Sequence, residues 1–169
     1  DGKHAAMASA LVDQGIFVYV PADVIVQSPL HSVLWLRGVT NFSKVVVVVE
    51  KGASLTYVHE LASDSRQSDQ LHAGTVEVFV GDGAELKLVE LQSLSDNCYH
   101  FSHEKSQVGR DGQLDWVFSA IGSKLTKSFL DLDLVGAGAW GRMSGFYFAA
   151  GKQHMDHDTQ QNHRAEGQT

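Results

Sequence analysis

The chain has 169 residues, of which 43% are hydrophobic, and it carries a formal net charge of −7. This length and apolar content suit one globular domain with a packed core. The negative charge argues against nucleic acid as a partner, because binding to a phosphate backbone depends on lysine and arginine.

Neither the apolar stretches nor the cysteine content is typical of a membrane or secreted protein. The longest apolar run, residues 45–49, is far shorter than the roughly 18 residues of a membrane span, and no signal peptide is evident. The single cysteine, Cys98, can form no internal disulfide and cannot alone hold an iron–sulfur cluster or a zinc ion. We interpret Cys98 as a semi-buried loop residue and expect a reducing, cytoplasmic setting.

The sequence predicts one short helix followed by a succession of strands. Residues 5–12 are rich in alanine and free of glycine and proline, which favours a helix, and Gly15 ends it. Short runs of β-branched and aromatic residues predict strands. These strands are residues 16–20, 24–26, 43–50, 55–61, 75–80, 86–91, 114–121, 129–135 and 143–150. Residues 62–70 and 93–103 are interpreted as loops, and residues 153–169 as a polar end segment.

Two of these strands carry patterns that indicate how they are buried. The five consecutive valines of residues 45–49 suit a strand that is buried on both faces. In residues 130–134, leucine alternates with Asp131 and Asp133. The leucines should therefore face a core, and the aspartates should face water or a partner instead of forming an acid–base pair.

A glycine turn recurs between the predicted strands. Gly52, Gly83, Gly112 and Gly138 lie 31, 29 and 26 residues apart. Taken locally, the Asp82-Gly83 turn between alternating runs predicts a hairpin and hence an antiparallel sandwich. The recurrence favours a solenoid, in which each unit buries its face on the next. The pattern by itself leaves both architectures open.

Three histidines near the end of the sequence are weak candidates for metal ligands: His154, His157 and His163. Imidazole is a common ligand of zinc and iron. On a strand, however, His154 and His157 point to opposite faces, so we interpret the set as a polar ladder along the strand. We assign no catalytic, cofactor-binding or metal residue. The alternative is a cupin-like or jelly-roll metal-binding protein that uses these three histidines.

Several blocks of the sequence resemble, in the same order, the SufB/SufD family of iron–sulfur cluster assembly scaffold proteins. The resemblance extends from about residue 3 to residue 163. The blocks are residues 15–21 (GIFVYVP), 74–83, 108–111, 114–117, 122–126 (GSKLT), 132–136, 145–148 and 153–159 (QHMDHDT), followed by Asn162 and His163.

This resemblance implies an all-β chain folded as a right-handed parallel β-helix. It also implies a non-catalytic scaffold that pairs with a SufB- or SufD-type subunit and with the SufC ATPase, to which the ATPase activity belongs. A nascent iron–sulfur cluster is implied for the full complex, and no cofactor for this chain. Family members have long carried the label of an ABC transporter permease component, although they have no membrane spans.

Within the family, the resemblance favours a SufD-like chain. SufB-type proteins carry a sulfur-accepting cysteine after the block that resembles residues 122–124, whereas this chain has Leu132 and Val135 there. Residues 1–169 are expected to form a single domain of the core β-helix, without the family's N-terminal helical region and its C-terminal Cys/His segment. The strand edges at the two ends of such a core favour self-association.

Overall fold

The structure is a computed structural model that describes residues 2–64 and 68–167, in which the chain winds as a β-solenoid. It begins with helix α1 (Lys3–Leu11), close to the predicted helix. The strands that follow are β1 (Gln14–Val20), β2 (Leu30–Leu36), β3 (Thr40–Val49), β4 (Ser54–Ser63), β5 (Gln70–Val80), β6 (Glu85–Leu94), β7 (Cys98–Val108), β8 (Gln113–Gly122), β9 (Leu125–Leu134), β10 (Trp140–Phe148) and β11 (His154–His163).

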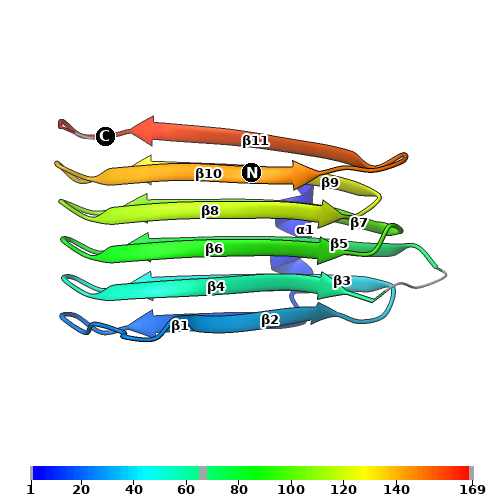
Figure 1. Ribbon diagram of the computed structural model, residues 1–169, viewed down its shortest axis with the longest axis horizontal. Coiled ribbons are helices and arrows are strands. Elements are labelled where there is room, and N and C mark those ends of the chain that lie inside the picture. The colour runs from blue at the N-terminus through cyan, green and yellow to red at the C-terminus, as the bar shows by residue number, and fades with distance from the viewer. Residues whose placement is uncertain (1, 65–67, 168–169) are drawn as a thin grey trace.

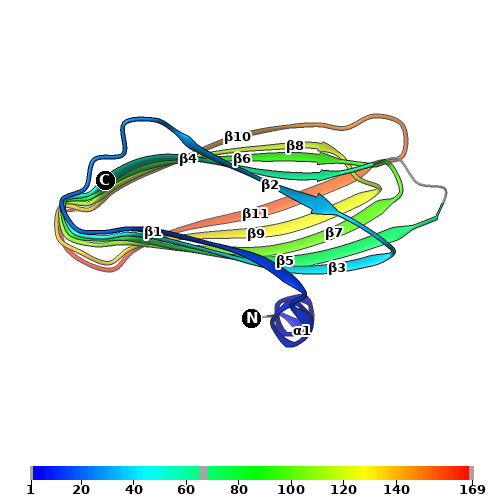
Figure 2. The ribbon, with the colours of Figure 1, turned by 90° about the horizontal axis from the view of Figure 1, so that it is seen from below.

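Successive strands alternate between two sheets. The odd-numbered strands form one sheet and the even-numbered strands form the other, each in chain order. The neighbouring strands pair in parallel, as in β4 with β6 and β5 with β7. Figure 1 shows the strands of each sheet stacked above one another, and Figure 2 shows the two sheets as facing layers. The expected parallel β-helix is confirmed.

The parallel pairing corrects the local interpretation of the glycine turns. β5 and β6 flank the turn at residues 81–84 but lie in different sheets, so this turn is a corner of one coil and not a hairpin. The antiparallel sandwich is therefore wrong, and so is the cupin-like or jelly-roll alternative that depends on it.

The core lies between the sheets and is built by alternation along each strand. In β9, Leu130, Leu132 and Leu134 are almost completely buried, whereas Asp131 and Asp133 lie on the outer face and are partly exposed. This confirms the predicted alternation. In β3 the same rule applies to the valine run, whose outward members are only half-buried. The prediction of a strand buried on both faces is therefore wrong for β3.

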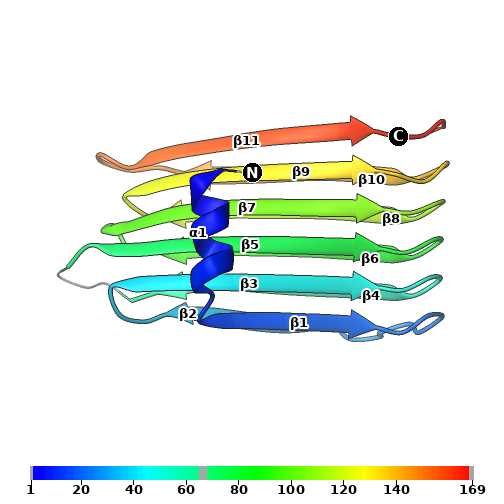
Figure 3. The ribbon, with the colours of Figure 1, turned by 180° about the vertical axis from the view of Figure 1, so that it is seen from behind.

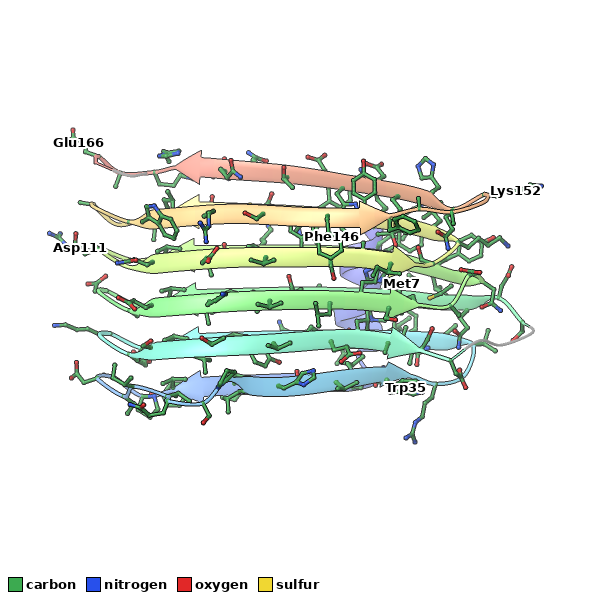
Figure 4. The ribbon with its side chains drawn as sticks, in the orientation of Figure 1. Met7, Trp35, Asp111, Phe146, Lys152 and Glu166 are labelled. Atoms are coloured by element: carbon green, nitrogen blue, oxygen red, sulfur yellow. The ribbon has the colours of Figure 1, made fainter. Side chains whose placement is uncertain are left out.

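The corners at one end of the solenoid are connected from coil to coil by backbone hydrogen bonds. The residues with a left-handed backbone in these corners are Asp23, Gly52, Gly83, Asp111 and Gly138. The amide groups of the first four donate hydrogen bonds to the next corner, as Gly52 does to Asp82 and Asp111 to Ala137, both at 3.0 Å. The residue equivalent to the glycines is thus Asp111, with φ 53°, and not Gly112. Aspartate is among the few residues that tolerate this conformation. Asp111 marks these corners in Figure 4.

The connections at the opposite end, where Figure 4 labels Lys152, differ in length from coil to coil. They comprise residues 37–39, 64–69, 95–97, 123–124 and 149–153. Of the predicted loop 62–70, residues 65–67 lie outside the described residues.

Three strands differ from the prediction. The second strand is β2, and the predicted strand at residues 24–26 is reduced to a single bridge between Ile25 and Ser54. Most of the predicted loop 93–103 belongs to β7, and much of the polar end segment belongs to β11. In β7 and β11, polar residues occupy inward positions, so neither strand shows the apolar alternation by which strands are found.

Helix α1 lies across the outer face of the odd-numbered sheet (Figure 3). It contacts β3, β5 and β7, buries Ala8 completely, and stacks His4 on Phe101 with ring centroids 3.9 Å apart. Within the described residues, no helix has the length and apolar character needed to cross a membrane.

Candidate functional site

A cavity of about 60 Å³, lined by both polar and apolar side chains, lies between the two sheets, toward the end where the even-numbered strands finish. Six titratable side chains line it, and they come from both sheets. They are His59 on β4, His72 on β5, Glu90 on β6, His100 and Glu104 on β7, and His157 on β11.

The strand register brings these side chains together. His72 and His100 are direct partners in the pairing of β5 with β7, and His59 and Glu90 are direct partners in the pairing of β4 with β6. Because paired residues in a sheet point to the same side, each pair faces the interior from its own sheet. The chemistry of the cavity is therefore set by residues about one coil apart in the sequence.

The two histidines of the odd-numbered sheet share a hydrogen bond. Their Nδ1 atoms are 2.8 Å apart, their rings stack with centroids 4.9 Å apart, and Ser43 Oγ lies 2.9 Å from His72 Nε2. One ring must donate and the other accept, which requires a neutral acceptor ring. Burial is the main cause that lowers the pKa of His100 to about 3 and the pKa of His72 well below 6.5. Both rings are thus neutral at physiological pH.

His59 is held on the facing sheet by a short polar chain. Its Nδ1 lies 3.1 Å from Ser32 Oγ, which lies 2.6 Å from the Tyr57 hydroxyl. Burial, with a smaller contribution from nearby His31, lowers the pKa of His59 from 6.5 to about 4. His59 is therefore also neutral at physiological pH.

Glu90 on β6 and Glu104 on β7 line the cavity from opposite sheets. The Trp116 Nε1–H group donates a hydrogen bond to Glu90 Oε2, at 2.6 Å. Burial is the largest cause that raises the pKa of both carboxyl groups, and the proximity of Glu104 raises the pKa of Glu90 further. The pair therefore retains a proton more strongly than isolated carboxyl groups do.

Of the three histidines singled out in the sequence, one lines the cavity. The His157 ring centroid lies 5.7 Å from those of both Phe118 and Tyr147, and its Nδ1 is buried without a hydrogen-bond partner among the described residues. His154 and His163 are exposed at the two ends of β11, so the strand keeps the three rings apart. In residues 2–64 and 68–167, no three or more His, Cys, Asp or Glu side chains are arranged to hold a metal ion.

Sequence reasoning did not assign the other five titratable residues to a common site, and it placed the cysteine in a loop. His72 and His100 are 28 residues apart, which is close to the length of one coil, so their spacing was the available signal. Cys98 is the first residue of β7 and is completely buried, not part of a loop. Burial raises the pKa of its thiol to about 11.

The comparisons with known proteins identify the family to which this chain belongs. The family model for the SUF system FeS cluster assembly, SufBD core domain, matches residues 35–169. The chain belongs to the SufBD family. It is 29% identical over 167 residues to an iron-sulfur cluster assembly SufBD family protein of Staphylococcus epidermidis. Similar proteins of Staphylococcus aureus and Staphylococcus saprophyticus are 29% and 28% identical.

These alignments cover 98% of the chain but 36% of each of these SufBD proteins. The chain thus spans about a third of the length of the curated relatives that it matches. The resemblance expected from the sequence blocks is confirmed at the level of the family.

Proposed function

We propose that this chain is the β-helix core of a SufD-like scaffold subunit, which acts in the cytoplasm with a SufB-type subunit and the SufC ATPase in iron–sulfur cluster assembly. The observation that carries the proposal is the match of the SufBD core model to residues 35–169. In this role the chain is not itself an enzyme. The cluster is the cargo of the assembly and not a resident cofactor of this chain.

The chemistry of the only cysteine in the sequence supports a SufD-like role. A sulfur acceptor reacts as a thiolate, so it must be accessible and have a low thiol pKa. Cys98 is completely buried, and burial raises its pKa to about 11. β9 follows residues 122–124 and corresponds to the segment in which SufB-type proteins carry the sulfur-accepting cysteine. It directs Thr126, Ser128 and leucines into the interior. In the proposed complex, a SufB-type partner supplies the sulfur-accepting thiol.

The strand edges support the expectation of a β-structured partner. Within the described residues, β1, β2, β10 and β11 each pair with one neighbouring strand, so each leaves one edge unpaired. Unpaired edges present backbone donors and acceptors to another chain. Self-association and pairing with a SufB-type subunit would both use these edges.

Co-expression of the full-length protein that contains this core with SufB-type and SufC subunits tests the proposal. We expect the three subunits to co-purify, with ATP hydrolysis that depends on SufC, and we expect cluster assembly to fall when the subunit is omitted. A Cys98→Ser variant should assemble clusters as well as the wild type, and no persulfide should form on Cys98. Persulfide formation on Cys98 would contradict the SufD-like role. Turnover of a substrate without SufC would contradict the scaffold role.

A further inference from the structure

The outer face of the even-numbered sheet is apolar along the last part of its strands. The register aligns five segments across the sheet, residues 31–35, 58–62, 89–93, 117–121 and 144–148. In each segment the first, third and fifth residues face outward and form three columns, which we call the even-sheet face. Trp35 and Phe146 mark two ends of this face in Figure 4. Its most exposed side chains are large and apolar, with 46–69% exposure: Val33, Trp35, Ile121, Phe146 and Phe148.

No helix in the described part of the chain covers this face. Parallel sheets are normally buried on both faces, and the odd-numbered sheet carries α1 on its outer side (Figure 2). Since a buried aromatic side chain contributes about 150–250 Å², the exposed fractions of these five residues correspond to roughly 500 Å² of apolar surface. Two such faces would bury roughly 1,000 Å² together, the size at which specific interfaces begin.

We propose that the even-sheet face joins two copies of this chain, about a two-fold axis that runs along its middle column. This rotation places the third column of one copy over the first column of the other, so bulky side chains meet smaller ones. Phe148 meets Ser144 and Ile121 meets Val117 of the second copy. The middle column meets itself, and Leu91 lies opposite its own copy. This contact goes beyond the SufD-like role, because it leaves the strand edges free for a partner subunit.

The same rotation brings opposite charges together beside the apolar columns. Lys87 precedes Leu91 by four residues, so it comes opposite the residue that follows Leu91 by four, next to Asp96 of the second copy. By the same rule, Asp115 on β8 comes next to Lys124 of the second copy. The two-fold axis repeats each contact, which gives four contacts between opposite charges. Charge complementarity thus favours a second copy as the occupant, although the chain carries a net charge of −7.

Sedimentation equilibrium of the full-length protein that contains this core measures the dissociation constant of the dimer. Leu91→Asp places two carboxylates on the two-fold axis and should weaken the dimer by at least about 100-fold. Phe79→Asp is the matched control on the outer side of the odd-numbered sheet and should leave the dissociation constant unchanged. A dimer that Leu91→Asp leaves intact uses another surface, such as the strand edges, and overturns the proposal. A monomeric wild type, as expected if another segment or protein covers the face, also overturns it.

Charge variants test the axis through side chains at the surface. Lys87→Glu should weaken the dimer by about tenfold, because it creates two contacts between like charges, and adding Asp96→Lys should recover most of this loss. Glu60 lies in the middle column and meets its own copy, while its Oε2 is 3.2 Å from His31 Nε2. Glu60→Gln should therefore tighten the dimer by about two- to fivefold. A double variant as weak as Lys87→Glu, or a Glu60→Gln dimer weaker than the wild type, overturns the arrangement.

Discussion

Acidification should destabilise the protein through His59, and the effect can be isolated with one substitution. Burial lowers the pKa of His59 from 6.5 in the unfolded chain to about 4 in the folded chain. Between these two values the unfolded state binds a proton that the folded state does not. The free energy of unfolding therefore falls as the pH falls from 6.5 toward 4.

The size of the effect follows from the difference in pKa. One pKa unit corresponds to about 1.36 kcal/mol, so acidification from pH 6.5 to pH 5 should remove about 2 kcal/mol of stability through His59 alone. His59→Asn cannot titrate, and its side-chain amide can take the position of Nδ1 beside Ser32. The variant should lose stability at pH 7 but should show a smaller loss on acidification than the wild type.

Urea denaturation at pH 7, 6, 5.5 and 5 measures both proteins under two-state conditions. Other titrating groups contribute equally to wild type and variant, so they cancel in the difference between the two free energies of unfolding. His154→Asn is the matched control, because His154 is exposed on β11. A difference between wild type and His59→Asn that stays constant from pH 7 to pH 5 would refute the reasoning.

Three further predictions concern the fold itself. Gly122 and Gly38 have nearly equal left-handed backbone angles, φ 80° and 78°, but a Cβ atom at Gly122 would overlap the Leu94 carbonyl oxygen, whereas one at Gly38 would meet no described residue within 4 Å. In chemical denaturation Gly38→Ala should cost about 1 kcal/mol and Gly122→Ala more than about 3 kcal/mol; equal losses would contradict the close approach of Leu94 to Gly122. Leu132→Ala should cost about 2–5 kcal/mol because it leaves a cavity in the core, and the neighbouring Asp131→Ala should change stability by less than about 0.5 kcal/mol. A thiol reagent at pH 8 should label Cys98 at least tenfold more slowly in the native protein than in guanidinium chloride, and rapid native labelling would show that this end of β7 opens.

The sequence pattern predicts the apolar half of the solenoid well and the polar half poorly. Leu130, Leu132 and Leu134 alternate with aspartates, so both the strand and its inward face can be inferred from hydrophobicity alone. β7 is one residue longer than β9, and His100 and Glu104 are buried in it. Residues 98–103 of this strand fall in the segment that is predicted to be a loop. Buried polar groups are stabilised by partners on other coils, which a local pattern cannot reveal.

Predicting the cavity requires the register between neighbouring strands as well as the positions of the strands. Glu90 and Glu104 line one cavity from opposite sheets, and the His72–His100 contact joins adjacent coils. Such proximity can be predicted only when the offset between consecutive coils is known to within one residue. The glycine spacing gave that offset approximately, and it placed Gly112 where the structure has Asp111.

The unequal ends of the solenoid determine where the chain can change in length. At the corner end, the left-handed residues Gly52, Gly83 and Asp111 are hydrogen-bonded from one coil to the next. One residue added in such a corner would displace its left-handed position and would turn every side chain of the following strand to the opposite face. At the other end the connections already differ among coils, and an insertion near Lys152 would extend away from the sheets. Peptide tags, reporter domains and evolutionary insertions should therefore be tolerated at that end alone.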